Sequence, residues 1–124
     1  MPKAKFSNIE LYYEEYGHGR PLLMILGLGQ DVATWGYQIP VLSNHCRLII
    51  FDNRDSGRSS RCSEPYTIET MARDVIGLMD YLEIDRANLL GTSMGGMIAQ
   101  QVALLTPEKV ASLILASTGS NGKE

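Results

Sequence analysis

The chain has 124 residues, 44% hydrophobic and 20% charged, enough for one globular domain with its own core. Its 14 acidic and 11 basic residues give a net charge of −3 and are mixed along the sequence, so no basic block could neutralise nucleic-acid phosphates. The sequence has no run that approaches a membrane span and no apolar core of a secretory signal. Cys46 and Cys62 have neither metal-ligand nor disulfide-framework spacing. These features predict a cytoplasmic protein without nucleic-acid or membrane partners.

The first elements predicted along the chain are β-strands. Residues 9–16 are rich in aromatic and β-forming side chains, and a turn-forming segment follows at 17–21, so we predict an antiparallel hairpin that enters the next strand. Residues 21–26 and 47–51 are short, continuous apolar runs, which are typical of parallel strands buried on both faces. A weaker helical pattern lies between them at 34–43.

The second half of the chain alternates strands and helices. Apolar residues of helical period form one stripe over 68–82, and Thr67 is placed to cap the start of that helix. A second helix is predicted over 97–105, ending before Pro107 because proline disfavours helical geometry in the residue before it. Strand patterns lie before and after this second helix, at 87–90 and 110–116. The alternation predicts a parallel sheet with helices on both faces.

One motif carries the chemistry: Gly91-Thr92-Ser93-Met94-Gly95, which joins an apolar strand directly to a helix. A nucleophilic serine on such a sharp turn has a strained backbone and crowded neighbours, and glycine at 91 and 95 removes the collisions. The turn would present the hydroxyl at the carboxyl edge of the sheet, with a helix N-terminus directed at developing negative charge. We therefore predict Ser93 as a catalytic nucleophile. The alternative is an ordinary glycine-rich turn.

A second candidate element is the loop Leu26-Gly27-Leu28-Gly29-Gln30-Asp31 at the end of the strand over 21–26. Acyl transfer needs two backbone N–H groups aimed at the oxyanion, one from the residue after the nucleophile and one from a loop of this kind. Met94 and Leu28 are the matching positions. We therefore predict an oxyanion hole formed by the backbone of these two residues.

The same loop also imitates a dinucleotide-binding unit. Gly27 and Gly29 follow a strand, and Asp52 follows the next strand, where a ribose-binding acid would lie. Val32 stands in place of the third glycine, and a nucleotide site would leave the serine turn unexplained. Nucleotide binding is therefore the weaker alternative, and we expect neither a cofactor nor a metal.

A dense polar loop, residues 52–60, follows the strand over 47–51. Its carboxylates could act as acids, bases or metal ligands. We favour a structural interpretation, in which Asp52, Arg54 and Asp55 brace one another and the free backbone groups at the strand end.

In this order and spacing, the three stretches resemble the N-terminal half of the α/β-hydrolase superfamily. The loop over 52–59 looks most like the branch of aclacinomycin-methylesterase-like and lactonase-like serine esterases. The resemblance implies an α/β fold with a mostly parallel sheet, an N-terminal antiparallel hairpin and helices on both faces. Residues 1–124 would form a single partial domain that has only the first six strands and lacks the lid and the last two strands. Leu26 replaces a histidine present in many relatives, which matters little where backbone groups form the hole.

The resemblance further implies that Ser93 attacks a small-molecule ester or lactone to form an acyl-enzyme. Serine needs a neighbouring base, and in this fold the chain order is serine, acid, histidine. No histidine follows Ser93, and the only acids after it are Glu108 and Glu124. His18 and His45 lie in a predicted turn and just before a strand, away from the usual catalytic edge. We therefore expect a fragment that is weakly active or inactive alone.

Two alternatives stay open for function, and one expectation concerns partners. The chain could be a noncatalytic binding or interaction module, or the complete protein could catalyse a perhydrolase-type reaction. An apolar strand over 110–116 would be an exposed sheet edge, which favours pairing with another chain. We expect a homo-oligomer or a complementing C-terminal chain.

Overall fold

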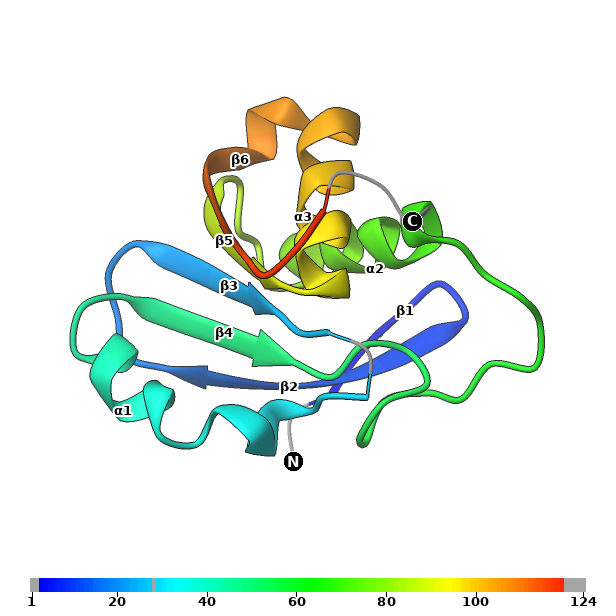
Figure 1. The fold of residues 1–124 in the computed structure, drawn as a ribbon, viewed down its shortest axis with the longest axis horizontal. Coiled ribbons are helices and arrows are strands. Elements are labelled where there is room, and N and C mark those ends of the chain that lie inside the picture. Colours follow the sequence, from blue (N-terminus) through cyan, green and yellow to red (C-terminus); the bar gives the residue numbers. More distant parts are fainter. Residues whose placement is uncertain (1–2, 28, 120–124) are drawn as a thin grey trace.

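The computed structural model describes residues 3–27 and 29–119, which form a sheet of six strands. In sequence order the strands are β1 (Lys3–Phe6), β2 (Ile9–Tyr16), β3 (Pro21–Ile25), β4 (Arg47–Phe51), β5 (Ala87–Thr92) and β6 (Val110–Ala116). Their order across the sheet is β1-β2-β4-β3-β5-β6 (Figure 1). β1, β2 and β4 pair antiparallel, and β4, β3, β5 and β6 run parallel to one another. The predicted fold class is confirmed, including its N-terminal antiparallel hairpin.

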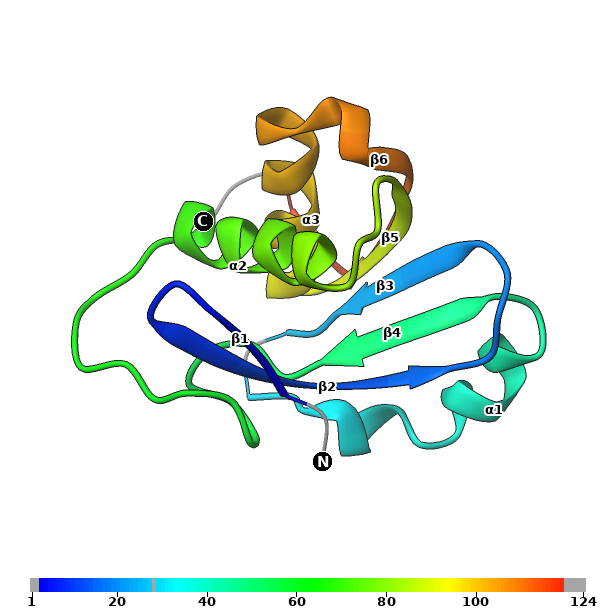
Figure 2. The same ribbon diagram turned by 180° about the vertical axis from the view of Figure 1, so that it is seen from behind.

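Helices cover both faces of the sheet, as the alternation of elements predicts. One face carries the 3-10 helix η1 (Val32–Trp35) and α1 (Gln38–Ser43), and the other carries α2 (Ile68–Tyr81) and α3 (Met94–Leu105), as Figures 1 and 2 show from opposite sides. A short 3-10 helix, η2 (Pro107–Lys109), leads from α3 into β6. None of these helices has the length and apolar character needed to cross a membrane, within the part of the chain that the structure describes.

The parallel strands are buried on both faces, which explains their continuous apolar sequences. In β3, Leu23 and Ile25 face the core under α2 and α3, whereas Met24 faces a second core under η1 and α1. β4 alternates in the same way. The sheet therefore lies between two apolar layers, and its strand ends are held at fixed positions for the loops that follow.

The position of the hairpin turn differs from the prediction. The turn lies at residues 7–8, between β1 and β2, and not in the segment 17–21. That segment instead carries the chain past β4, which lies between β2 and β3. Gly17 adopts a φ of +77° there, and a Cβ on it would lie 3.2 Å from the backbone carbonyl carbon of Ser43. The glycine-rich turn is thus needed for close packing and not for a two-residue hairpin.

The helices match the predictions with two changes at their ends. The pattern over 34–43 forms η1 and α1 as separate short helices, and α3 begins at Met94, three residues before the predicted start at Met97. The predicted cap is confirmed, because the Thr67 hydroxyl accepts a hydrogen bond of 3.1 Å from the backbone N–H of Thr70. The end of α3 before Pro107 is also confirmed.

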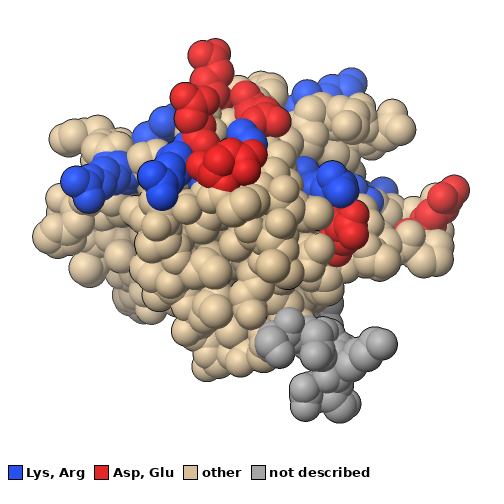
Figure 3. Space-filling view, turned by 90° about the horizontal axis from the view of Figure 1, so that it is seen from above, with Lys and Arg blue, Asp and Glu red and all other residues tan. Residues whose placement is uncertain are grey.

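The two outer strands of the sheet differ in chemistry. β1 has four residues, two of them lysines, which is typical of an edge protected from pairing. β6 has seven residues and no charge, and Leu113, Ile114 and Leu115 are 37%, 49% and 42% exposed. Figure 3 looks down on the end of the molecule that carries α3 and β6, where a broad area shows no charged side chain. β6 therefore has the chemistry of an inner strand at an outer position.

Candidate active site

Ser93 lies between the last residue of β5 and the first residue of α3, with an exposed side chain. Its backbone angles are φ 55° and ψ −124°, a conformation that costs a non-glycine residue about 1–3 kcal/mol. Hydrogen bonds to the backbone of Ser93 stabilise this conformation. The Ser93 N–H donates to the carbonyl of Ala116 in β6 (3.0 Å), and its own carbonyl accepts from the Gly96 N–H (2.9 Å) and the Thr118 hydroxyl (2.6 Å).

Glycines surround Ser93 where the turn brings backbones together. A Cβ on Gly91 would lie 2.6 Å from Cα of Gly96, and one on Gly95 would lie 2.8 Å from the Leu26 carbonyl oxygen. Both distances are shorter than real Cβ contacts. β5, α3 and the end of β3 therefore meet at a spacing that only glycine permits at positions 91 and 95.

Of the two residues predicted to form an oxyanion hole, the structure describes Met94 only. Met94 is the first residue of α3, and the first N–H groups of a helix have no partner within the helix. Leu28 lies outside the described residues. Its neighbour Gly27 is beside the serine, because a Cβ on Gly27 would lie 3.1 Å from Cβ of Ser93. The loop after β3 therefore reaches the serine at the carboxyl edge of the sheet.

A pocket of about 490 Å³ lies next to this turn. Met94 lines it from α3 and Gly29 from the loop after β3. Ile68 and Met71 of α2 give it an apolar wall, and Tyr66 lines it from the segment before that helix. The pocket is large enough for a small organic molecule and opens beside the residues next to Ser93.

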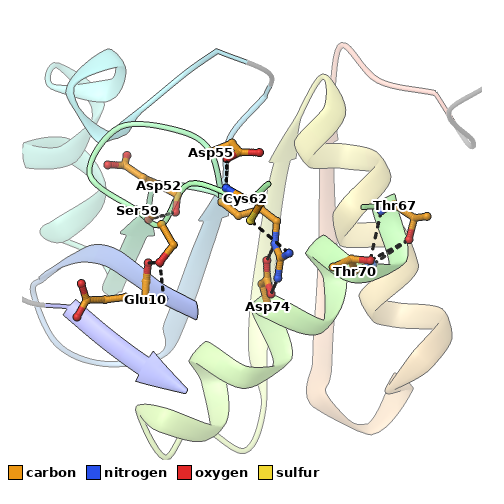
Figure 4. A network of polar contacts seen from close by, with 10 residues as sticks. Glu10, Asp52, Asp55, Ser59, Cys62, Thr67, Thr70 and Asp74 are labelled. Atoms are coloured by element: carbon orange, nitrogen blue, oxygen red, sulfur yellow. Dashed lines mark hydrogen bonds and ion pairs between the residues drawn. The ribbon is translucent and has the colours of Figure 1, made fainter. Parts of the chain in front are cut away.

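The polar loop after β4 confirms part of the structural interpretation and corrects the rest. Asp52 braces backbone groups as predicted, because its carboxylate accepts from the N–H groups of Val32 (2.8 Å) and Arg58 (2.9 Å). Asp55 likewise accepts from the Cys62 N–H at 2.6 Å. The predicted bracing of these residues by Arg54 is wrong. Its guanidinium lies against the carboxylate of Asp74 in α2, with two hydrogen bonds of 2.7 and 2.8 Å (Figure 4).

The environments of Asp52 and Asp55 shift their acidities in opposite directions. Burial raises the pKa of Asp52, although the two backbone N–H groups oppose the shift. A hydrogen bond from Tyr66 lowers the pKa of the exposed Asp55. Since Asp52 is buried and both its oxygens bind backbone groups, it does not take the position of a ribose-binding acid, and the dinucleotide alternative loses its support.

Neither histidine lies at the serine's edge of the sheet. His18 and His45 are exposed and come just before β3 and β4, whereas Ser93 follows β5. Because these three strands run parallel, their starting and finishing ends lie at opposite edges. Among residues 3–27 and 29–119, no group of three His, Cys, Asp or Glu side chains could hold a metal ion.

The sheet architecture and the strand–serine–helix turn are those of a known protein family, which comparison with family sequences identifies. Residues 20–123 match the family described as the alpha/beta hydrolase fold. The chain belongs to this family.

Its relatives include hydrolytic enzymes. The chain is 36% identical over 117 residues to a protein of Azorhizobium caulinodans provisionally named carbamate hydrolase RutD, covering 94% of this chain and 44% of that protein. It is 35% identical over 115 residues to 3-oxoadipate enol-lactonase 2 of Acinetobacter baylyi, covering 91% and 43%. Among solved structures, Est816, described as an N-acyl homoserine lactone degrading enzyme, matches with a TM-score of 0.91 at 32% identity, covering 95% of this chain and 46% of that one. The chain thus spans less than half the length of these relatives.

Proposed function

We propose that Ser93 is the nucleophile of a serine hydrolase that cleaves carboxylic esters or lactones through an acyl-enzyme. The backbone conformation of Ser93 is the observation that carries the proposal. A serine with φ 55° between a buried parallel strand and a helix N-terminus presents its hydroxyl where negative charge can be stabilised. Strain of this kind persists only where the surrounding structure maintains it, and it gathers at functional sites.

In the proposed reaction, Oγ of Ser93 attacks the substrate carbonyl carbon and its proton passes to a base. The backbone N–H groups of Met94 and Leu28 stabilise the oxyanion that forms. The carbon–oxygen bond to the alcohol then breaks, and the base returns the proton to that alcohol, which stays attached to the acyl group if the substrate is a lactone. Water attacks the acyl-enzyme in the same way, releasing the acid and restoring Ser93.

We further propose that the base is a histidine from a part of the complete protein beyond these 124 residues. The two histidines of the sequence lie at the opposite edge of the sheet. Without a base, serine is a weak nucleophile near neutral pH. An oxyanion hole alone still accelerates hydrolysis by about 10³–10⁴-fold over water in serine proteases, so we expect slow turnover by this chain.

Reaction with a fluorophosphonate tests the proposed nucleophile. We expect mass spectrometry to find the adduct on Ser93, none in Ser93→Ala, and faster labelling when imidazole is added as a diffusible base. Ser117 is an exposed serine that follows β6 at the same edge of the sheet, so Ser117→Ala is the matched control and should label normally. Labelling that survives in Ser93→Ala, or that spreads equally over other serines, would contradict the proposed nucleophile.

A noncatalytic binding module is the second candidate, favoured by the position of both histidines away from Ser93. In that case Ser93→Ala would leave ligand binding and biological activity unchanged, and imidazole would not accelerate labelling of the natural chain. The imidazole experiment therefore separates the two candidates.

We also propose that the outer edge of β6 pairs with another polypeptide, either a second copy or a complementing C-terminal chain. The strand is long, uncharged and apolar on both faces, which favours pairing along its free edge. We expect sedimentation velocity to show association that increases with concentration and that Ile114→Lys weakens. Leu104→Lys, at an exposed apolar position on α3, is the control and should associate like the natural chain. A natural chain that stays monomeric at all concentrations would count against the pairing.

A further inference from the structure

Two consecutive side chains after β4 bind the loop that follows β3. Asn53 and Asp52 are both buried, although buried asparagine and aspartate are uncommon. Neither lies in the serine turn. We infer that Asn53 and Asp52 are positioning residues, which hold the two ends of the loop after β3 and thereby set its place beside Ser93. The catalytic consequence rests on the proposed function, whereas the structural consequence does not.

Asn53 holds the first end of the loop. Its Nδ2 donates a hydrogen bond of 3.0 Å to the carbonyl oxygen of Leu26, the residue directly after β3. That carbonyl also lies against the first turn of α3, where a Cβ on Gly95 would approach it to 2.8 Å. The Leu26 carbonyl is therefore fixed between Asn53 on one strand end and the helix that begins after Ser93.

Asp52 holds the second end of the loop. One oxygen of its carboxylate accepts the N–H of Val32, the first residue of η1, and the other accepts the N–H of Arg58. Hydrogen bonds from backbone N–H groups to a carboxylate are stronger than those between neutral groups. Because Val32 is buried as well, this anchor joins the end of the loop to the core under η1.

Gln30 connects the middle of the loop to the serine strand. Its Oε1 accepts the N–H of Gly27 at 2.9 Å and the hydroxyl of Thr92 at 3.4 Å, and Thr92 directly precedes Ser93. The backbone N–H of Gln30 donates in turn to the Gly27 carbonyl at 3.2 Å. The described residues of the loop, 26–27 and 29–32, are thus held at three points. A donor in it would shift if any of these points were lost, and a misplacement of about 1 Å can slow a reaction roughly 100-fold.

The inference is tested with Asn53→Leu, which keeps the size of the side chain but removes its donor. Asn44 is an exposed residue after α1, and Asn44→Leu is the matched control. We expect hydrogen exchange in residues 26–32 to rise roughly tenfold in Asn53→Leu, while exchange in α2 and in the control stays unchanged. With imidazole present, the maximal rate of fluorophosphonate labelling should fall roughly 10- to 100-fold, with half-saturation unchanged.

Two further variants cover loss of folding. If exchange in α2 rises too, Asn53→Leu has unfolded the chain. Two other variants then test the inference: Asp52→Asn, and Gln30→Met at a half-exposed position. Gln30→Met removes its anchor, whereas Asp52→Asn weakens its anchor because the amide keeps one acceptor oxygen for two backbone N–H groups. Each should raise exchange in residues 26–32 alone. The inference is overturned if the folded variants exchange like the natural chain in that segment, or if labelling slows with no change in exchange. A natural chain that never labels at Ser93 refutes the proposed function, and the exchange result still decides the positioning role.

Discussion

Replacing Gly95 by alanine is expected to lower the free energy of unfolding by at least about 3 kcal/mol. Alanine is normally the better helix former by about 1 kcal/mol, so ordinary helix propensity predicts the opposite sign. The added Cβ would lie 2.8 Å from the Leu26 carbonyl oxygen and nearer still to that of Ile25. Both are backbone atoms at the end of β3, and they can move away only if α3 separates from the sheet. Chemical denaturation followed by circular dichroism measures the effect.

Gly36→Ala is the control for that experiment. Gly36 has a φ of −54°, which any residue adopts, and the nearest atom to an added Cβ is 3.7 Å away. The same chemical change should therefore leave stability within about 0.5 kcal/mol or raise it slightly, because alanine reduces the freedom of the unfolded chain. Equal effects at the two glycines would show that the close contact between α3 and β3 does not form.

Most of this fold can be predicted from the sequence because most of its strands and helices have apolar patterns within their own segments. The continuous apolar runs of β3 and β4 and the apolar stripe of α2 require no knowledge of distant partners. The pattern of residues does not predict the first strand, for a physical reason. β1 has four residues that alternate lysine with apolar side chains, and Ser7 occupies its turn with φ 50°, where glycine or asparagine would give a clearer signal.

The candidate site likewise combines a local feature, which the sequence predicts, with contacts between distant residues, which it does not. The glycine spacing around Ser93 is a local pattern, so the sequence alone predicts the turn. Asn53 and Asp74 act on atoms that are 27 and 20 residues away in sequence, and such pairs depend on how the elements pack. The sequence does contain a signal for Asp74, because this carboxylate lies on the buried side of α2, three residues after Met71. A charge at a core position predicts a buried partner, although not which one.

The pair formed by Asp74 and Arg54 should give the second large effect. Their side chains are only 8% and 17% exposed, and Arg54 also lies over the ring of Tyr66 at 5.3 Å. Asp74→Ala is expected to lower the free energy of unfolding by about 3–5 kcal/mol, because it leaves the guanidinium largely buried without its carboxylate. Urea denaturation measures the loss. Glu69→Ala breaks the exposed pair of Glu69 with Arg73 on the same helix and should change stability by less than about 1 kcal/mol.

A double substitution separates the value of the pair from the penalty of breaking it. Burial raises the pKa of Asp74 and Arg54 opposes that shift, while the hydrogen bonds to Asp74 raise the pKa of Arg54. Both charges are largely removed from water, and replacing a buried ion pair by apolar side chains of similar size is often neutral or stabilising. Replacing both residues by apolar ones of similar size, Asp74→Leu with Arg54→Met, should therefore recover most of the stability lost in Asp74→Ala. If the double variant is as unstable as the single one, the pair itself holds the loop after β4 against α2. Recovery would instead show that apolar packing suffices to join them.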